Sequence, residues 1–268
     1  MTAKVVLDSI SPEGDRLTTL EVRMHRFVLA EFNTHRVFSR NSASSRAIPV
    51  EKRIRQLWAN PARPISWPRE QSGMQGGEEL TGSDLADARL LWSDIEEHVL
   101  VEVSRYIETH DPEDRLHKSV LNRLLEPFMW HTVVVTSTEW ENFFEQRCSP
   151  LAQPEIRAAA DKMSLAMLAS TPCPLERMEW HTPYIQADEY EDMDEIDRIK
   201  VSVARCARVS YLTQDGVRDI RKDLELFDRL SSADPPHWSP LEHVARPALV
   251  TDKVLGNFRG WHQLRHLW

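Results

Sequence analysis

The chain has 268 residues, a formal net charge of −9 and three cysteines. This length is sufficient for a hydrophobic core without covalent cross-links, and we predict a single domain over residues 1–268. The cysteines are far apart and form no CxxC pair, which fits neither a disulfide framework nor a cysteine-rich zinc site and indicates a reducing cytoplasm. Because no apolar run approaches membrane-spanning length and the net charge is acidic, we expect a cytoplasmic protein that binds neither membranes nor nucleic acid.

Positive charge is concentrated in one segment of this acidic chain. Residues 188–197 are almost continuously acidic, whereas the only acidic residues in 24–55 are Glu31 and Glu51. A local basic segment on an acidic protein suits a small phosphorylated ligand, and a solvated charged surface is the alternative. The basic residues of the segment are Arg26, Arg36, Arg40, Arg46, Lys52, Arg53 and Arg55.

The first quarter of the chain predicts two strands and a polar loop. Strands are expected over residues 4–10 and 17–25, since Leu20, Val22 and Met24 alternate with polar residues in the second, and a short helix should follow. Residues 39–49 are so rich in serine, asparagine and arginine that we expect an ordered polar loop and no buried element. A helix is expected next, over residues 50–58, and the prolines and glycines after it predict a long surface connection.

The remaining elements are mostly helical. Apolar residues at helical spacing predict a long helix after Ser83 and a second one over 112–125, and both should supply much of the core. Thr136 and Glu139 fit a capping box that opens a helix through Arg147. The other expected elements are a strand at 132–135, helices at 154–168, 199–209 and 217–230, a strand at 244–250 and a last helix at 254–267.

The most informative segment is Thr34-His35-Arg36, followed after seven residues by Ser44; Ser39, Asn41 and Arg46 lie in the same run. Guanidinium forks, hydroxyls and loop N–H groups of this kind can bind phosphates. A polar loop that caps the following helix is the alternative. The run resembles the signature of flavin-dependent thymidylate synthases, which reads RHR, seven residues, S.

Three further segments resemble motifs of the same family. Residues 136–147 followed by AQPEI at 152–156 are similar to a helix that ends in a substrate-facing arginine, here Arg147. Without the family, Arg147 would be a cation that stabilises a helix C-terminus. Residues 207–210 are similar to the ARVS segment. Residues 237–243 are similar to H-x-[ST]-P-x-E-H.

The resemblance implies a mixed α+β fold with a central, mostly antiparallel sheet and flanking helices, and a homotetramer with sites between subunits. It also implies that reduced FAD mediates transfer of a one-carbon unit from methylenetetrahydrofolate to C5 of dUMP, with NADPH as reductant. The implied catalytic residues are Arg147, His237 and Ser44. The implied cofactor-binding residues are His35, Arg36, Asn142, Ser210, Ser239 and Arg265. The implied substrate-binding residues are Ser39, Ser44, Arg46, Lys118, Arg147 and Gln263.

The chain departs from the family pattern in composition and in order. Thr34, Ser42, Ala47 and Leu151 stand where the family has arginine, glutamate, tyrosine and histidine. The ARVS-like and H-x-[ST]-P-x-E-H-like segments follow the RHR-like run, whereas they precede it in the family, which predicts a circular permutation. Residues 256–266 resemble the family's ARQWFRH helix, and we expect this tail to lie beside residues 36–46, where Gln263 and Arg265 would replace lost contacts.

Three alternatives stay open. The same chemistry could act on dCMP, by methylation or hydroxymethylation, or the protein could bind flavin and nucleotide without turnover. A metal hydrolase built on Glu242, His243, His181 and His237 is the third, although no HExxH spacing supports it and we expect no metal.

Overall fold

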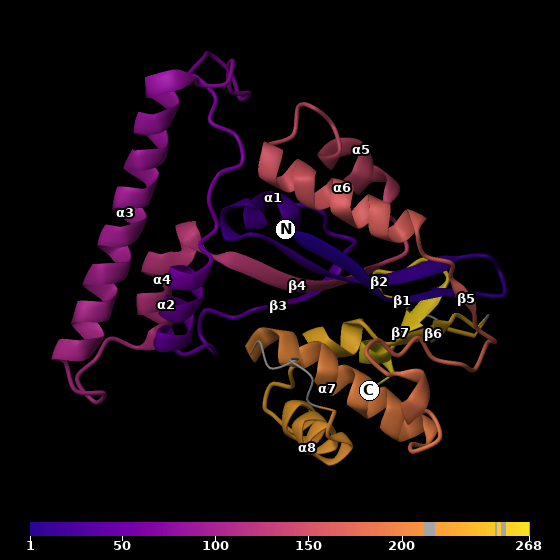
Figure 1. The fold of residues 1–268 in the computed structure, drawn as a ribbon. Helices are drawn as coiled ribbons and strands as arrows, with labels where there is room; N and C mark the ends of the chain where they lie inside the picture. Colours follow the sequence, from indigo (N-terminus) through magenta and orange to yellow (C-terminus); the bar gives the residue numbers. More distant parts are fainter. Residues whose placement is uncertain (212–217, 250, 253–255, 268) are drawn as a thin grey trace.

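A five-stranded sheet forms the centre of the molecule (Figure 1). The structure is a computed structural model that describes residues 1–211, 218–249, 251–252 and 256–267. The strand order is β3-β4-β2-β1-β5, and every pair is antiparallel except β1 with β5. The expected mixed α+β class with a mostly antiparallel sheet is therefore confirmed. The strands are β1 (Thr2–Ile10), β2 (Arg16–His25), β3 (Ser39–Ser42), β4 (Trp130–Ser137) and β5 (Cys173–Pro174).

One face of the sheet carries the main apolar core. Leu20, Val22 and Met24 alternate along β2 and are fully buried against Ile156 and Met163, because successive side chains of a strand point to opposite faces. The helices on this side are α1 (Leu29–Asn33), α5 (Glu141–Arg147) and α6 (Pro154–Leu168) (Figure 1). The opposite face of β2 therefore carries polar residues such as Thr19 and Arg23.

The C-terminal third packs on that polar face (Figure 1). Its helices are α7 (Glu195–Arg208) and α8 (Ile220–Ser231), and a small antiparallel sheet follows, formed by β6 (Ala245–Pro247) and β7 (Trp261–Gln263). A separate apolar cluster joins Leu17 of β2 to Phe258 and Trp261, which are 2% and 0% exposed. The two ends of the chain are thus packed together by buried aromatic residues.

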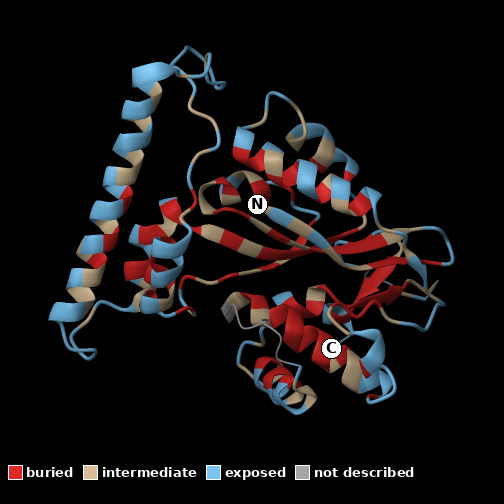
Figure 2. Cartoon of the chain, in the orientation of Figure 1, coloured by how far each residue is buried: buried red, intermediate tan, exposed pale blue. Residues whose placement is uncertain are grey.

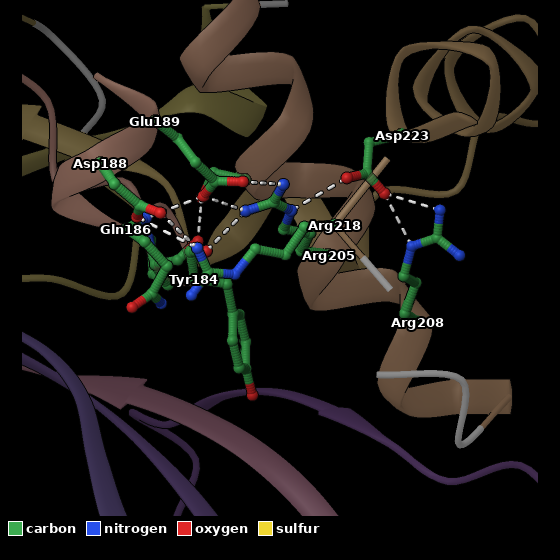
Figure 3. Close-up of polar contacts among 10 residues, drawn as sticks. Tyr184, Gln186, Asp188, Glu189, Arg205, Arg208, Arg218 and Asp223 are labelled. Carbon is green, nitrogen blue, oxygen red and sulfur yellow. Dashed lines mark hydrogen bonds and ion pairs between the residues drawn. The ribbon is translucent and has the colours of Figure 1, made fainter. Parts of the chain in front are cut away.

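Helices α7 and α8 are also joined by buried ion pairs (Figure 3). The Arg205 guanidinium lies 2.7 Å from Glu189 and 2.9 Å from Asp223, and Arg208 lies 2.6 Å from the second Asp223 oxygen. The Asp223 side chain is 0% exposed. Removing one partner of such a group would leave an uncompensated buried charge.

Helix α3 (Gly82–Thr109) extends along one side with α2 (Val50–Ala59) and α4 (Lys118–Leu125) (Figure 1). Only Glu96, Leu100 and Val103 of α3 are buried, and most of its surface is exposed (Figure 2). Leu90 and Leu91 are more than half exposed. The expectation that this helix supplies much of the core is therefore wrong, because one narrow stripe is enough to pack on α2 and α4.

Three elements have bounds that differ from expectation. The expected polar loop begins as β3, whose backbone pairs with β4 and buries Ser39 and Asn41. Thr136 lies inside β4 and cannot cap α5, which begins at Glu141. Helix α4 begins only at Lys118, because the side chain of His117 caps it.

The expectation of a helix in the C-terminal tail is also wrong. Residues 261–263 form β7 beside β6, and a 3-10 turn over Leu264–His266 follows. Burial of Trp261 and the pairing with β6 outweigh the local helical preference. Parts of the segments expected at 217–230, 244–250 and 254–267 lie outside the described residues. No helix in the described part of the chain is long and apolar enough to span a bilayer.

Candidate functional site

Strand β3 places polar side chains of the motif on the face that contacts the C-terminal third. Ser39 and Asn41 are two residues apart and so point to the same side of the sheet, opposite Thr136 and Val134 of β4. Ser39 is 0% exposed, and its hydroxyl accepts a hydrogen bond of 2.8 Å from Gln263. Burial of these polar groups is possible because each has a partner.

Asn41 connects three segments that are distant in sequence. Its amide nitrogen donates to the Cys206 carbonyl oxygen at 2.7 Å, which fixes the side chain against α7. Its Oδ1 accepts hydrogen bonds from the hydroxyls of Ser239 at 3.2 Å and Ser210 at 3.5 Å. The backbone N–H of Ser44 also donates to the Ser210 carbonyl oxygen at 3.0 Å. Two serines expected to contact flavin are therefore brought together with the run expected to bind phosphate.

Asn41 itself was not predicted as a site residue. The signal that could have found it is its spacing: it is two residues from Ser39, so in a strand both face the same way. Its position as the shared acceptor depends on the folding of Ser210 and Ser239 onto β3, which no local pattern predicts.

Arg147, the last residue of α5, contacts the segment that resembles RHR. Its Nε donates to His35 Nε2 at 3.0 Å, and its Nη2 donates to the Thr34 hydroxyl at 3.0 Å and to the Glu31 carbonyl oxygen at 3.3 Å. Burial, and then the charges of Arg147 and Arg40, lower the pKa of His35. The imidazole is therefore neutral at neutral pH and accepts at Nε2, so its proton is on Nδ1.

The two partners of this arginine–histidine contact line two different cavities. A cavity of about 270 Å³ is lined by His35, Arg36 and Asn142, three of the expected cofactor-binding residues. A cavity of about 710 Å³ is lined by Arg147 and Glu31, together with residues of the connection 64–79. Arg147 thus lines the larger cavity and is hydrogen-bonded to His35, which lines the smaller one.

The other expected phosphate contacts lie at the end of β3. Arg46 is exposed, and its backbone N–H donates to the Ser44 hydroxyl at 3.2 Å. Lys118, from α4, donates to the Ala47 carbonyl oxygen at 3.1 Å. Ser44 and Arg46 of this turn and Lys118 of α4 thus offer a hydroxyl, a guanidinium and an ammonium group.

Among the described residues, Arg265 and His237 are less closely connected to β3 than Gln263, which binds Ser39. Arg265 forms an ion pair with Glu242, and Gln263 donates to the Glu242 carbonyl oxygen at 2.8 Å. His237 is exposed. Among the described residues, no hydrogen bond joins His237 or Ser44 to Arg147, so the three expected catalytic residues do not form one bonded cluster within a single chain.

The histidines of the metal-hydrolase alternative belong to a buried chain of hydroxyl groups. His181 bonds to the Ser9 and Thr19 hydroxyls, each at 2.8 Å; Thr19 contacts Thr136 at 2.7 Å, and Thr136 contacts His243 at 2.8 Å. Within the described residues, no group of three potential metal ligands is formed. Both histidines therefore have a structural explanation, as links between β1, β2, β4 and the C-terminal third.

Buried histidines make the fold sensitive to mild acid. Burial lowers the pKa of His131, His181 and His243 to about 3, compared with their ordinary value of 6.5. Below pH 6.5 the unfolded chain binds protons that the folded chain excludes, so stability falls as the pH falls. We expect the free energy of unfolding to drop by about 2 kcal/mol between pH 7.5 and 6.0, measured by urea denaturation at both values. The control variant His110→Gln removes an exposed histidine and should show the same drop as the wild-type protein. A free energy of unfolding that stays constant between pH 7.5 and 6.0 would contradict the prediction.

Comparisons with known proteins agree with the motifs in the first part of the chain. A family model described as "Thymidylate synthase complementing protein" matches residues 17–173, which include β2, β3, β4 and Arg147. No curated protein sequence matches the chain. The circular permutation concerns segments outside this match and stays a prediction.

Solved structures show weak similarity. A UMP/dUMP methylase, PolB from Streptomyces cacaoi, aligns in its complex with 5-Br UMP at 15% identity over 62% of this chain and 87% of that chain, with a TM-score of 0.49. Its complex with 5-Br dUMP aligns at 16% identity over 57% of this chain and 66% of that chain, just under two thirds, with a TM-score of 0.43. The flavin-dependent thymidylate synthase ThyX from Helicobacter pylori, complexed with FAD and dUMP, aligns at 12% identity over 56% of this chain and 67% of that chain, with a TM-score of 0.38.

Proposed function

Because the chain belongs to the thymidylate synthase complementing protein family, we propose that it is a flavin-dependent, thymidylate synthase-like methyltransferase. Its reaction is the transfer of a one-carbon unit from methylenetetrahydrofolate to C5 of a pyrimidine deoxynucleotide, with dUMP as the first candidate. The observation that carries the proposal is the hydrogen bond of 3.0 Å between Arg147 and His35. It joins the residue expected to contact the pyrimidine to a residue expected to contact the flavin.

Arg147 is suited to act on a pyrimidine carbonyl. Its Nε and Nη2 are held by His35, Thr34 and Glu31, whereas Nη1 makes no hydrogen bond to a described residue. A donor held in place in this way can stabilise negative charge that develops on a base carbonyl, without reorganising during the reaction. Ser44 and Arg46, with Lys118 nearby, would hold the nucleotide phosphate. Ser39 and Gln263 would keep β3 in position beneath the substrate.

The residues of the smaller cavity fit part of a flavin cofactor. His35, Arg36 and Asn142 offer an aromatic ring, a cation and an amide. Its volume, about 270 Å³, is below the usual range for a drug-sized ligand, so it can hold only a portion of FAD. The rest of FAD would extend over Ser210 and Ser239 or onto a second subunit, as expected for a homotetramer with shared sites. When bound and reduced, with NADPH as the electron source, the flavin would supply the redox chemistry.

One observation favours dCMP as a second candidate substrate. The Oε2 atom of Glu31 is buried, lacks a hydrogen-bond partner among the described residues, and belongs to a side chain that lines the same cavity as Arg147. A carboxylate oxygen can accept a hydrogen bond from the 4-amino group of cytosine, whereas the uracil O4 offers no proton. If Glu31 faces position 4 of the base, dUMP would leave this buried acceptor without a donor, which costs free energy and would discriminate against uracil.

Parallel assays with dUMP and dCMP test both candidates. FAD binding to the purified protein, seen as an absorbance shift, should be followed by formation of a C5-modified nucleotide detected by mass spectrometry when methylenetetrahydrofolate and NADPH are present. If dCMP is the substrate, Glu31→Gln should lower kcat/KM for dCMP about tenfold or more, equivalent to about 1.4 kcal/mol, and should change the value for dUMP little. Tight binding of FAD and nucleotide without any product would instead support the alternative of a binding protein, and the absence of FAD binding would overturn the proposal.

A further inference from the structure

A third cavity, of about 360 Å³, lies between α2 and the polar face of the sheet. It is lined by Lys52, Arg53 and Gln56 of α2 and by Arg23, Trp130 and Thr132 of β2 and β4, among others. None of the residues that we assign to the nucleotide or the flavin lines it. Its lining therefore belongs to a separate site, which combines cationic and amide side chains with apolar ones such as Leu57 and Met129.

Arg53 is the most unusual residue of this lining. It is 3% exposed, and its Nε and Nη2 have no hydrogen-bond partner among the described residues; its Nη1 donates to Gln56 Oε1 at 3.2 Å. Burial, and then the charge of Arg26, lower the pKa of Arg53 to about 10, so the guanidinium is still charged at neutral pH. A buried charge of this kind destabilises a fold unless a partner compensates for it.

The charge of Glu126 compensates that of Arg53 in part, but among the described residues Glu126 accepts no hydrogen bond from Arg53. Glu126 accepts hydrogen bonds from Arg26 at 3.0 Å, Arg123 at 2.9 Å and Ser45 at 2.7 Å. One negative charge is thus already shared by two guanidinium groups before Arg53 is considered.

Arg23, the cation that β2 contributes to this cavity, is also poorly compensated. The Arg23 guanidinium lies 5.0 Å from the centre of the Trp130 ring, and burial lowers its pKa. An aromatic ring face attracts a cation but does not neutralise its charge. The cavity therefore combines excess positive charge with unpaired donors of a buried arginine.

We propose that this cavity binds the phosphate group of a small phosphorylated ligand, at a site separate from the nucleotide phosphate site at Ser44 and Arg46. The Nε and Nη2 atoms of Arg53 form the fork that binds two oxygens of an oxyanion at once. Arg23, on the same cavity, adds a second positive charge, which favours an anion of more than one negative charge and so distinguishes phosphate from a single carboxylate. The basic segment of residues 24–55 is in this way divided between two phosphate sites.

Calorimetry and thermal unfolding at constant ionic strength test this site. Inorganic phosphate or pyrophosphate is added to the full-length protein without flavin or nucleotide. A ligand that binds only the folded state raises Tm, so both anions should raise Tm in the wild-type protein. Arg53→Met should weaken phosphate binding at least tenfold. In the absence of phosphate its Tm should be equal to or above the wild-type value, since the substitution removes an unpaired buried charge.

Two matched variants separate this site from other sources of phosphate binding. Arg55→Met changes an exposed arginine of the same helix and should bind phosphate as the wild-type protein does. Arg46→Ala removes a residue of the proposed nucleotide site and should keep the phosphate-dependent rise in Tm. The proposal is overturned if wild-type Tm does not respond to either anion, or if Arg53→Met keeps the full response while Arg46→Ala loses it. If Arg53→Met does not fold, Arg23→Gln provides the same comparison, with tenfold weaker binding expected.

Discussion

Replacing Arg147 by alanine is expected to lower kcat for nucleotide methylation by about 10²- to 10³-fold, the usual effect of removing one donor that stabilises a transition-state oxyanion. The guanidinium lines the larger cavity and is held by His35 and Thr34, so its loss removes a positioned donor and leaves the His35 acceptor without its partner. FAD affinity should change little, because the proposed flavin contacts lie in the neighbouring cavity. The measurement is single-turnover kinetics at saturating nucleotide, with FAD binding followed separately.

Two further variants sharpen this test. Arg147→Lys keeps the charge but loses the fork that contacts both His35 and Thr34, and it should recover only part of the rate. Arg157→Ala removes a half-exposed arginine of α6 that is 4.0 Å from Asp161 and should leave the rate unchanged. Near-normal turnover in Arg147→Ala would assign this residue to stabilisation of the C-terminus of α5.

Asp223→Ala is expected to lower the free energy of unfolding by about 3–5 kcal/mol, the typical loss when a buried ion pair is broken on one side. The Asp223 carboxylate is completely buried and contacts Arg205 at 2.9 Å and Arg208 at 2.6 Å (Figure 3). Glu189 would still neutralise Arg205, but Arg208 would lose its acidic partner. Urea denaturation followed by circular dichroism measures the change.

The exposed ion pair in the same region provides the control. Arg218 and Asp188 are 2.8 Å apart, with side chains 49% and 72% exposed, so Asp188→Ala should lower the free energy of unfolding by less than about 1 kcal/mol. If Asp223→Ala had an effect as small as this control, solvent or a rearranged partner would have to compensate the two arginines. The contrast between the variants therefore measures how much burial increases the contribution of an ion pair to the free energy of unfolding.

Several elements could be predicted from local patterns because their periodicity is written in neighbouring residues. The alternation of Leu20, Val22 and Met24 predicts β2 and the face that it buries, and Pro154 with the apolar spacing after it predicts α6. The motif segments also predicted the family, since residue types at fixed spacing are visible without any three-dimensional information. The single domain, the homotetramer and the roles of the site residues stay predictions.

Only the tertiary structure decided features that depend on distant parts of the chain. Residues 39–42 form a strand because β4, almost a hundred residues later, pairs with them, and residues 261–263 form a strand because β6 and Leu17 bury Trp261. The meeting of Ser210 and Ser239 at Asn41 has the same origin. Tertiary packing also decides that Arg53 is buried, because the sequence of α2 by itself does not distinguish Arg53 from the neighbouring cations Lys52 and Arg55. The sequence determined which side chains were present, and long-range pairing and burial decided which of them share a site.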